Sequence, residues 1–220
     1  MIFAGFEGQR VMVKELEGFV AKLTALGGGS GYSRDVYEDW APTYELNLHQ
    51  DYGYIAHRIA AAVFAEHCTD RNVRILDLGC GTGLVGTELA AHGFRNLDGL
   101  DISPKMLDEA RGKKIYHDLL IGDMTGPINL GGRKYGAAIG VGCFGGGHVG
   151  PEHLPEMISC VQPGGLLVFY VNAIPYDQDD YPSHFSSLEA DGIWCVQLTK
   201  RSNYMQAIER LGWVLVANRT

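Results

Sequence analysis

Short apolar runs alternate with amphipathic segments along most of this chain. Apolar residues recur at helical spacing through residues 11–26, and again at Ile55, Ile59, Ala62 and Val63, which predicts two amphipathic helices. From residue 73 onward, apolar runs predict strands and the segments between them predict helices, which is typical of a mostly parallel sheet covered on both faces. The predicted strands are residues 73–78, 97–101, 115–121, 135–142, 166–171, 194–199 and 213–218, and the predicted helices are 84–92, 103–111, 152–161 and one between the last two strands.

A glycine-rich segment at residues 27–31 divides the chain into two expected parts. Its sequence, Gly-Gly-Gly-Ser-Gly, is typical of a flexible linker. We therefore expect residues 1–31 to form an N-terminal helix and linker, and residues 32–220 to form one domain. That domain is long enough to bury a sizeable core. Its first part is rich in aromatic side chains, at Tyr32, Tyr37, Trp40 and Tyr44.

The composition is that of an ordinary globular protein, with 46% hydrophobic and 20% charged residues. The formal net charge is −8, and lysine and arginine are few and scattered, which argues against binding to nucleic acids or acidic membranes. The five cysteines form no CxxC pair, so neither a disulfide framework nor a metal site is expected. No apolar run is long enough to span a bilayer, and the first residues lack the features of a signal peptide. We therefore expect a cytoplasmic protein.

The first strand of the predicted sheet ends in an acidic residue and a glycine loop, Asp-Leu-Gly-Cys-Gly-Thr-Gly, at residues 77–83. Glycines permit a tight turn and a close approach of a ligand to the backbone, and the following helix offers free amide donors. A glycine loop of this kind also occurs in nicotinamide-binding domains. Asp77 is the additional signal, because a carboxylate there disfavours a pyrophosphate and suits a ligand that carries an ammonium group.

Two further acidic residues follow the second and third predicted strands. A carboxylate at Asp101 can accept hydrogen bonds from both hydroxyls of a ribose, a device that nicotinamide enzymes share. Asp98 lies earlier in the same strand and suits this role less well. A carboxylate at Asp123 can accept from an adenine amino group with Met124 packed on the ring, although an acid at this position is equally typical of an ordinary turn.

Together these motifs resemble those of the class I S-adenosylmethionine-dependent methyltransferases, over about residues 35–175. The set comprises residues 77–83, Asp101, Asp123 and the Pro-Gly-Gly turn at 163–165. Residues 36–45, 54–58 and 147–150 resemble, more narrowly, the family of the methyltransferase-like protein of the Williams–Beuren syndrome deletion region and its bacterial relatives. Two features depart from that family: His57 stands where proline is expected, and residues 142–147 are richer in glycine.

The resemblance implies a Rossmann-like, seven-stranded, mostly parallel sheet with an N-terminal helical lid at residues 32–66, and S-adenosylmethionine as the cofactor. Asp77 and the loop glycines would line its methionine tail, Asp101 its ribose, and Ile102, Asp123 and Met124 its adenine, while the backbone near Gly142 would accept from the ammonium group. Aromatic faces attract cations, which suits a lid over a sulfonium. The implied cofactor-binding residues are Tyr37, Trp40, Tyr44, Asp77, Gly79, Cys80, Gly81, Asp101, Ile102, Met106, Asp123, Met124, Gly142 and Cys143.

The acceptor of the methyl group is less well defined by the sequence. His148 follows the fourth strand and is a candidate general base, although a histidine there also suits a plain loop. Residues 140–146 contain no Asn-Pro-Pro-Tyr or Asp-Pro-Pro-Tyr, which makes planar nitrogen acceptors less favoured. We expect a methyltransferase that acts on a small molecule. The alternatives are a nicotinamide-dependent oxidoreductase and a non-catalytic protein that binds S-adenosylmethionine.

Overall fold

The computed structural model describes residues 53–145, 148–206 and 210–220, together with residues 34, 35, 38, 41 and 45. The helix predicted at 11–26, the glycine-rich linker, and Tyr37, Trp40 and Tyr44 lie outside the described residues.

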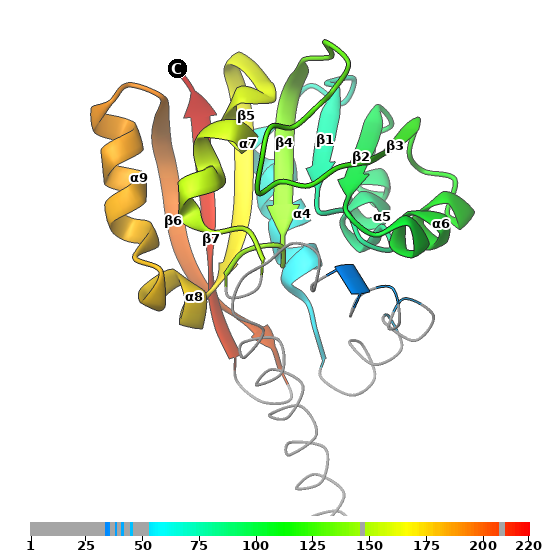
Figure 1. Cartoon of the computed structure of the whole chain (residues 1–220), viewed down its shortest axis with the longest axis horizontal. Helices are drawn as coiled ribbons and strands as arrows, with labels where there is room; N and C mark the ends of the chain where they lie inside the picture. Colours follow the sequence, from blue (N-terminus) through cyan, green and yellow to red (C-terminus); the bar gives the residue numbers. More distant parts are fainter. Residues whose placement is uncertain are drawn as a thin grey trace, which may run out of the picture.

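A seven-stranded sheet forms the centre of the domain, in the order β3-β2-β1-β4-β5-β7-β6 (Figure 1). The first five strands pair in parallel, and β7 pairs antiparallel with both β5 and β6. The expected seven-stranded, mostly parallel fold is thereby confirmed. The carboxyl ends of the parallel strands form one edge, at the bottom of Figure 1. The strands are Ile75–Leu78 (β1), Leu97–Asp101 (β2), Asp118–Ile121 (β3), Tyr135–Val141 (β4), Val161–Asn172 (β5), Trp194–Met205 (β6) and Arg210–Arg219 (β7).

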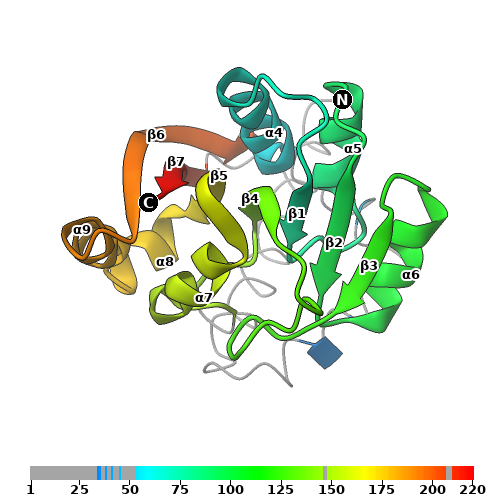
Figure 2. The ribbon, with the colours of Figure 1, turned by 90° about the horizontal axis from the view of Figure 1, so that it is seen from above.

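Helices cover both faces of the sheet (Figure 2). Helices α4 and α5 share one hydrophobic core with the sheet, and α7, α8 and α9 contribute to a second core on the opposite face. Helix α6 packs on β2 and β3 next to the start of α5. The helices are Ala56–His67 (α4), Leu84–Ala91 (α5), Pro104–Gly112 (α6), the 3-10 helix Pro151–His153 (η3), Leu154–Ser159 (α7), Ala173–Gln178 (α8) and Tyr181–Ala190 (α9).

Local sequence explains how the central elements form. All four residues of β1 are buried, as expected for a central strand that is covered on both faces. Side chains alternate along it, so that Ile75 enters the core beneath α4 and α5, while Leu76 and Leu78 enter the opposite core. Helix α6 begins as predicted at Ser103, whose hydroxyl accepts from the Met106 amide.

The structure differs from the sequence predictions in three places. The helix predicted between the last two strands is wrong, because β6 continues to Met205 and β7 begins at Arg210. Helices α8 and α9 were not predicted, and the acidic residue Asp177 lies in α8. Helix α4 exists, but it buries Ala56, Ala60, Ala61, Val63 and Phe64, a face rotated from the predicted one, because its small residues allow close packing on the sheet.

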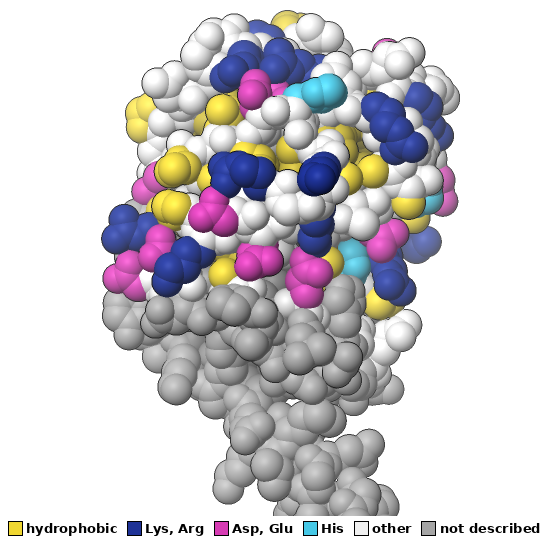
Figure 3. Space-filling model, turned by 90° about the vertical axis from the view of Figure 1, so that its right-hand side faces the viewer, with side chains coloured by type: hydrophobic (Ala, Val, Ile, Leu, Met, Phe, Trp, Pro, Cys, Tyr) yellow, Lys and Arg dark blue, Asp and Glu magenta, His cyan; other side chains and the backbone are white. Residues whose placement is uncertain are grey.

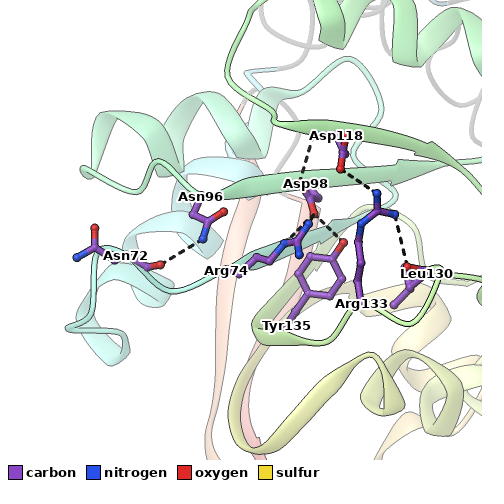
Figure 4. Close-up of polar contacts among 8 residues, drawn as sticks. All are labelled: Asn72, Arg74, Asn96, Asp98, Asp118, Leu130, Arg133 and Tyr135. Carbon is purple, nitrogen blue, oxygen red and sulfur yellow. Dashed lines mark hydrogen bonds and ion pairs between the residues drawn. The ribbon is translucent and has the colours of Figure 1, made fainter.

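The amino edge of the sheet is held by a polar network around Asp98, which is fully buried (Figure 4). Its carboxylate accepts from Arg74 Nη2 at 2.6 Å, from the Tyr135 hydroxyl at 2.8 Å and from the Asp118 amide at 3.2 Å. Arg133 forms an ion pair with Asp118 at 3.0 Å. These contacts link the ends of β1, β2, β3 and β4, and they place Asp98 away from the carboxyl edge.

Candidate functional site at the carboxyl edge

The glycine loop after β1 has the backbone conformation that the sequence predicts. Gly79, Gly81 and Gly83 all have positive φ, which only glycine adopts without strain. A Cβ atom on Gly79 would lie 2.7 Å from the Cβ of Cys143, so the loop packs closely on the end of β4. A Cβ on Gly81 would meet no atom of the described residues within 4 Å. The backbone at Gly81 therefore borders open space, as a ligand-binding loop requires.

Asp101 holds this loop from the end of β2. Its Oδ2 accepts from the Gly81 amide at 2.8 Å, and its Oδ1 accepts from the Ser103 amide at 2.9 Å. Burial raises the pKa of Asp101, and these amide donors act in the opposite direction. A carboxylate oxygen has two lone pairs, so both oxygens retain capacity for hydroxyl donors of a ligand.

Asp77 is a buried carboxyl group immediately before the loop, with no exposed surface. Its Oδ2 accepts from the Tyr116 hydroxyl at 2.6 Å, whereas Oδ1 has no hydrogen-bond partner among the described residues. Burial raises the pKa of Asp77 to about 7, and the Tyr116 hydrogen bond counteracts part of that effect. The sequence did not indicate Tyr116, because no local pattern pairs residues that are 39 positions apart.

The third acidic residue lies in a turn after β3. Asp123 Oδ1 accepts from the amide and the hydroxyl of Thr125, at 2.8 and 2.7 Å. This is the geometry of an Asx turn, which the sequence allowed as the ordinary alternative. Met124 is buried, and its Cε lies 3.3 Å from the position of a Cβ on Gly79. The turn and the glycine loop are therefore neighbours.

The carboxyl end of β4 also borders the candidate site. Gly142 has a φ of 73°, and the Tyr54 hydroxyl lies 3.2 Å from the position of a Cβ on that glycine. Tyr54 precedes α4 and stacks on His57. Tyr54 was not among the predicted site residues, since only the folded chain brings it to β4. Burial raises the pKa of the Cys80 and Cys143 thiols, so both stay protonated at neutral pH.

Three other predicted residues differ in accessibility. His148 is half-buried, and its amide donates to the Gly145 carbonyl at 2.7 Å. This loop packs on α8, because a Cβ on Gly145 would lie 2.1 Å from the Cβ of Pro175. Ile102 is partly exposed next to Asp101, whereas Met106 is buried in α6.

A cavity of about 460 Å³ lies beside this edge, between α4, α5 and the segment after α6. None of the predicted cofactor residues lines it. Glu45, which follows the expected lid aromatics in sequence, forms an ion pair there with Lys113. The cavity is lined by Glu45, His57, Arg58, Leu84, Thr87, Glu88, Lys113 and Ile115.

The described residues contain neither a cluster of metal-binding side chains nor a helix that could span a membrane. No group of three or more His, Cys, Asp or Glu side chains in this part of the chain is placed to hold a metal ion. Within the same ranges, every helix is too short or too polar to cross a membrane.

Part of the chain matches a known family of protein domains. Residues 75–165 match the methyltransferase domain family. This segment therefore forms a methyltransferase domain. It includes the glycine loop, Asp101, Asp123 and the end of β4, so the resemblance inferred from these motifs is confirmed.

The relatives of this methyltransferase domain extend the match. Human methyltransferase-like protein 27 is 34% identical over 134 residues, which cover 60% of this chain and 54% of the human protein. The 18S rRNA (guanine-N(7))-methyltransferase of Bos taurus is 40% identical over 72 residues, covering 33% of this chain and 25% of the bovine protein. The chain thus spans about half, or less, of the length of these curated relatives.

A solved structure shows the same fold. The crystal structure of magnesium protoporphyrin IX methyltransferase from Synechocystis PCC 6803 with bound SAM aligns with a TM-score of 0.67 at 16% sequence identity. The alignment covers 87% of this chain and 97% of that one, so the two chains share a fold.

Proposed function

We propose that this protein binds S-adenosylmethionine along the carboxyl edge of its sheet and transfers the methyl group to a small-molecule acceptor. One observation carries the proposal. Asp77, Asp101 and Asp123 lie in or just after three adjacent strands, around a glycine loop that borders open space at Gly81. In open parallel sheets, ligands bind in the crevice outside these strand ends.

The residues present fit each part of the cofactor. Asp101 would accept from the ribose hydroxyls, while it keeps its bonds to the loop. Ile102, Asp123 and Met124 would contact the adenine. The buried Oδ1 of Asp77 is an unsatisfied acceptor, which suits the ammonium group of the methionine tail.

The same polar arrangement disfavours the alternative of a nicotinamide dinucleotide. A pyrophosphate needs donors and positive charge at the glycine loop. Here the loop follows the buried Asp77, and Asp101 occupies the Gly81 amide. The match of residues 75–165 to the methyltransferase family supports the same choice.

When bound, S-adenosylmethionine supplies an activated methyl group with a good leaving group. The chain then has to align the acceptor and exclude water. We assign the aligning surface to the ends of β4 and β5, near Tyr54, residues 143–145 and His148. His148 is our candidate for the base, and it would be required only for an acceptor that loses a proton before attack.

The choice of a small-molecule acceptor rests on charge. The relatives include an enzyme named for 18S rRNA, and a protein that grips RNA normally presents a basic face. The net charge here is −8. On the face in Figure 3, Lys and Arg side chains are interspersed with Asp and Glu side chains. Some of the basic side chains form ion pairs, since Arg111 pairs with Asp108 and Arg133 pairs with Asp118.

The test has two steps. Calorimetry should show binding of S-adenosylhomocysteine and no binding of NAD⁺, and Asp101→Ala should lower the affinity for S-adenosylhomocysteine at least tenfold, since charge-assisted hydrogen bonds contribute about 1.5–3 kcal/mol each. Unchanged affinity in this variant would remove the ribose assignment. Transfer of a labelled methyl group to a small-molecule panel, with RNA as the comparison, then tests the acceptor class. Binding without transfer to any acceptor would favour the non-catalytic alternative.

The N-terminal lid stays a prediction. We propose that Tyr37, Trp40 and Tyr44 close over the bound cofactor, since Glu45 already contacts Lys113 beside the site. Hydrogen exchange of residues 32–45 should slow when S-adenosylhomocysteine is added. Equal protection with and without this ligand would exclude a lid.

A further inference from the structure

Tyr116 lies before β3 in the chain but contacts Asp77 of β1 at the carboxyl edge of the sheet. It precedes β3, two strands away from Asp77 in β1, yet its hydroxyl lies 2.6 Å from Asp77 Oδ2. Burial raises the pKa of this phenol well above its usual range, so the hydroxyl is the proton donor in the pair. A sequence-distant, buried phenol is therefore fixed on one oxygen of the carboxylate.

Helix α5 is shaped around the ring of Tyr116. A Cβ on Gly86 would lie 2.3 Å from the Tyr116 hydroxyl oxygen, and a Cβ on Gly83 would lie 3.1 Å from Cε2 of the same ring. Gly86 lies within α5, where glycine is less favourable than alanine. Glycine therefore stands in α5 at a position where any side chain would overlap the Tyr116 hydroxyl. The sequence of α5 thus fits the Tyr116–Asp77 hydrogen bond.

The two oxygens of Asp77 differ in their surroundings. Oδ2 is occupied by Tyr116, while Oδ1 is buried without a hydrogen-bond partner in the described part of the chain. A buried acceptor left in this state is unfavourable, and a donor that arrives with a ligand would satisfy it.

We propose that Tyr116 is a positioning residue for the cofactor: its hydroxyl fixes one oxygen of the Asp77 carboxylate so that the other faces the ammonium group of the methionine tail. This inference rests on the proposed assignment of Asp77 to that ammonium group. It adds a residue of the α6–β3 connection to the methionine subsite.

The charges around Asp77 set the expected pH dependence. The titratable groups that act on it are Tyr116, Asp101 from β2, Cys80 from the loop and Cys143 after β4. With the pKa of Asp77 at about 7, affinity for an ammonium ligand falls as the pH drops through neutrality. The Tyr116 hydrogen bond favours the charged carboxylate. Its removal should raise the pKa of Asp77 and move this fall to higher pH.

The test compares Tyr116→Phe with Tyr135→Phe. Both substitutions delete one buried tyrosine–aspartate hydrogen bond, but Tyr135 donates to Asp98 at the opposite edge. Calorimetry on the full chain would use S-adenosylhomocysteine and 5′-methylthioadenosine, which lacks the ammonium and carboxylate, between pH 6 and 8. Tyr116→Phe should weaken S-adenosylhomocysteine binding about tenfold, as expected for a hydrogen bond to a charged group, and leave methylthioadenosine binding within about twofold. Tyr135→Phe should leave both affinities unchanged.

Two further variants separate the possible failures. Gly86→Ala places a Cβ where the Tyr116 hydroxyl lies, and it should give the same selective loss. Equal loss of both ligands in Tyr116→Phe, or an unchanged affinity and pH profile, would overturn the positioning role. Asp77→Asn tests the underlying assignment: unchanged S-adenosylhomocysteine binding would refute the role of Asp77 itself, whereas weakened binding with a normal Tyr116→Phe variant would refute Tyr116 alone.

Discussion

Gly81→Ala is the substitution that tests the cofactor site most directly. Gly81 has a φ of 53°, and an added Cβ would meet no atom within 4 Å in the part of the chain that the structure describes. An alanine in a left-handed conformation costs about 1–2 kcal/mol, so we expect the melting temperature to fall by about 2–8 °C in a chain of this size. The added methyl group would also occupy the space that we assign to the cofactor. Affinity for S-adenosylhomocysteine should therefore fall tenfold or more, which is at least about 1.4 kcal/mol.

Gly164→Ala is the matched control. Gly164 has a φ of 80°, and a Cβ there also meets no atom of the described residues within 4 Å, but Gly164 lies near the amino end of β5, at the opposite edge of the sheet. The two variants should lose similar stability in urea or thermal unfolding, and only Gly81→Ala should lose affinity in calorimetry. If Gly81→Ala binds S-adenosylhomocysteine as tightly as Gly164→Ala does, the cofactor does not cover the loop and the site is misplaced.

Three other predictions concern stability and turnover. Burial raises the pKa of Asp77 from its ordinary value of 3.8 to about 7 in the folded protein, so its contribution to stability is fully present below about pH 4 and is lost as the pH rises through 7. The urea-unfolding free energy, measured without cofactor relative to Asp77→Asn, should fall by about 1.4 kcal/mol per pH unit in this window, and a pH-independent difference would contradict the burial argument. His148→Ala should lower turnover by about 10²–10⁴ with cofactor affinity unchanged, and near-parental turnover from pH 6 to 9 would remove His148 as the base. Asp98→Ala should lower the free energy of unfolding by about 3–5 kcal/mol, because it leaves Arg74 and Tyr135 without their buried partner. The affinity of this variant for S-adenosylhomocysteine should be unchanged at a temperature where the variant is folded. A large loss of affinity would show that the two edges of the sheet are coupled.

The sequence predicted the parallel core of the sheet because central strands are apolar on both faces. Periodicity sufficed for β1, β2 and β4, and the Ser103 cap fixed the start of α6. It located the centres of β6 and β7 but wrongly placed a helix between them, because residues 199–203 of β6 are exposed or partly exposed and carry no apolar run. It also misplaced the buried face of α4, since alanines fit a tight interface but contribute little to an apolar pattern.

The candidate site likewise contains residues that the sequence predicts and residues that it misses. Asp77 and Gly81 at the end of β1, and Asp101 at the end of β2, carry local signals that motif spacing captures. The contacts of Tyr116 and Tyr54 depend on residues far apart in sequence, and only the pairing of strands and helices reveals them. The structure also shows that Asp101 holds the loop through the Gly81 amide, a contact that motif spacing does not reveal.

The Asp98 network also bears on how this protein can change over evolutionary time. Its hydrogen bonds and ion pair link the amino ends of β1, β2, β3 and β4, at the edge opposite the proposed cofactor site (Figure 4). Substitutions around Tyr54, Gly145 and α8 do not remove any of these hydrogen bonds or the ion pair. Under the proposed function, mutations there can alter acceptor preference while much of the folding stability is maintained elsewhere, so lineages can diversify their substrates without first acquiring compensating stabilising changes.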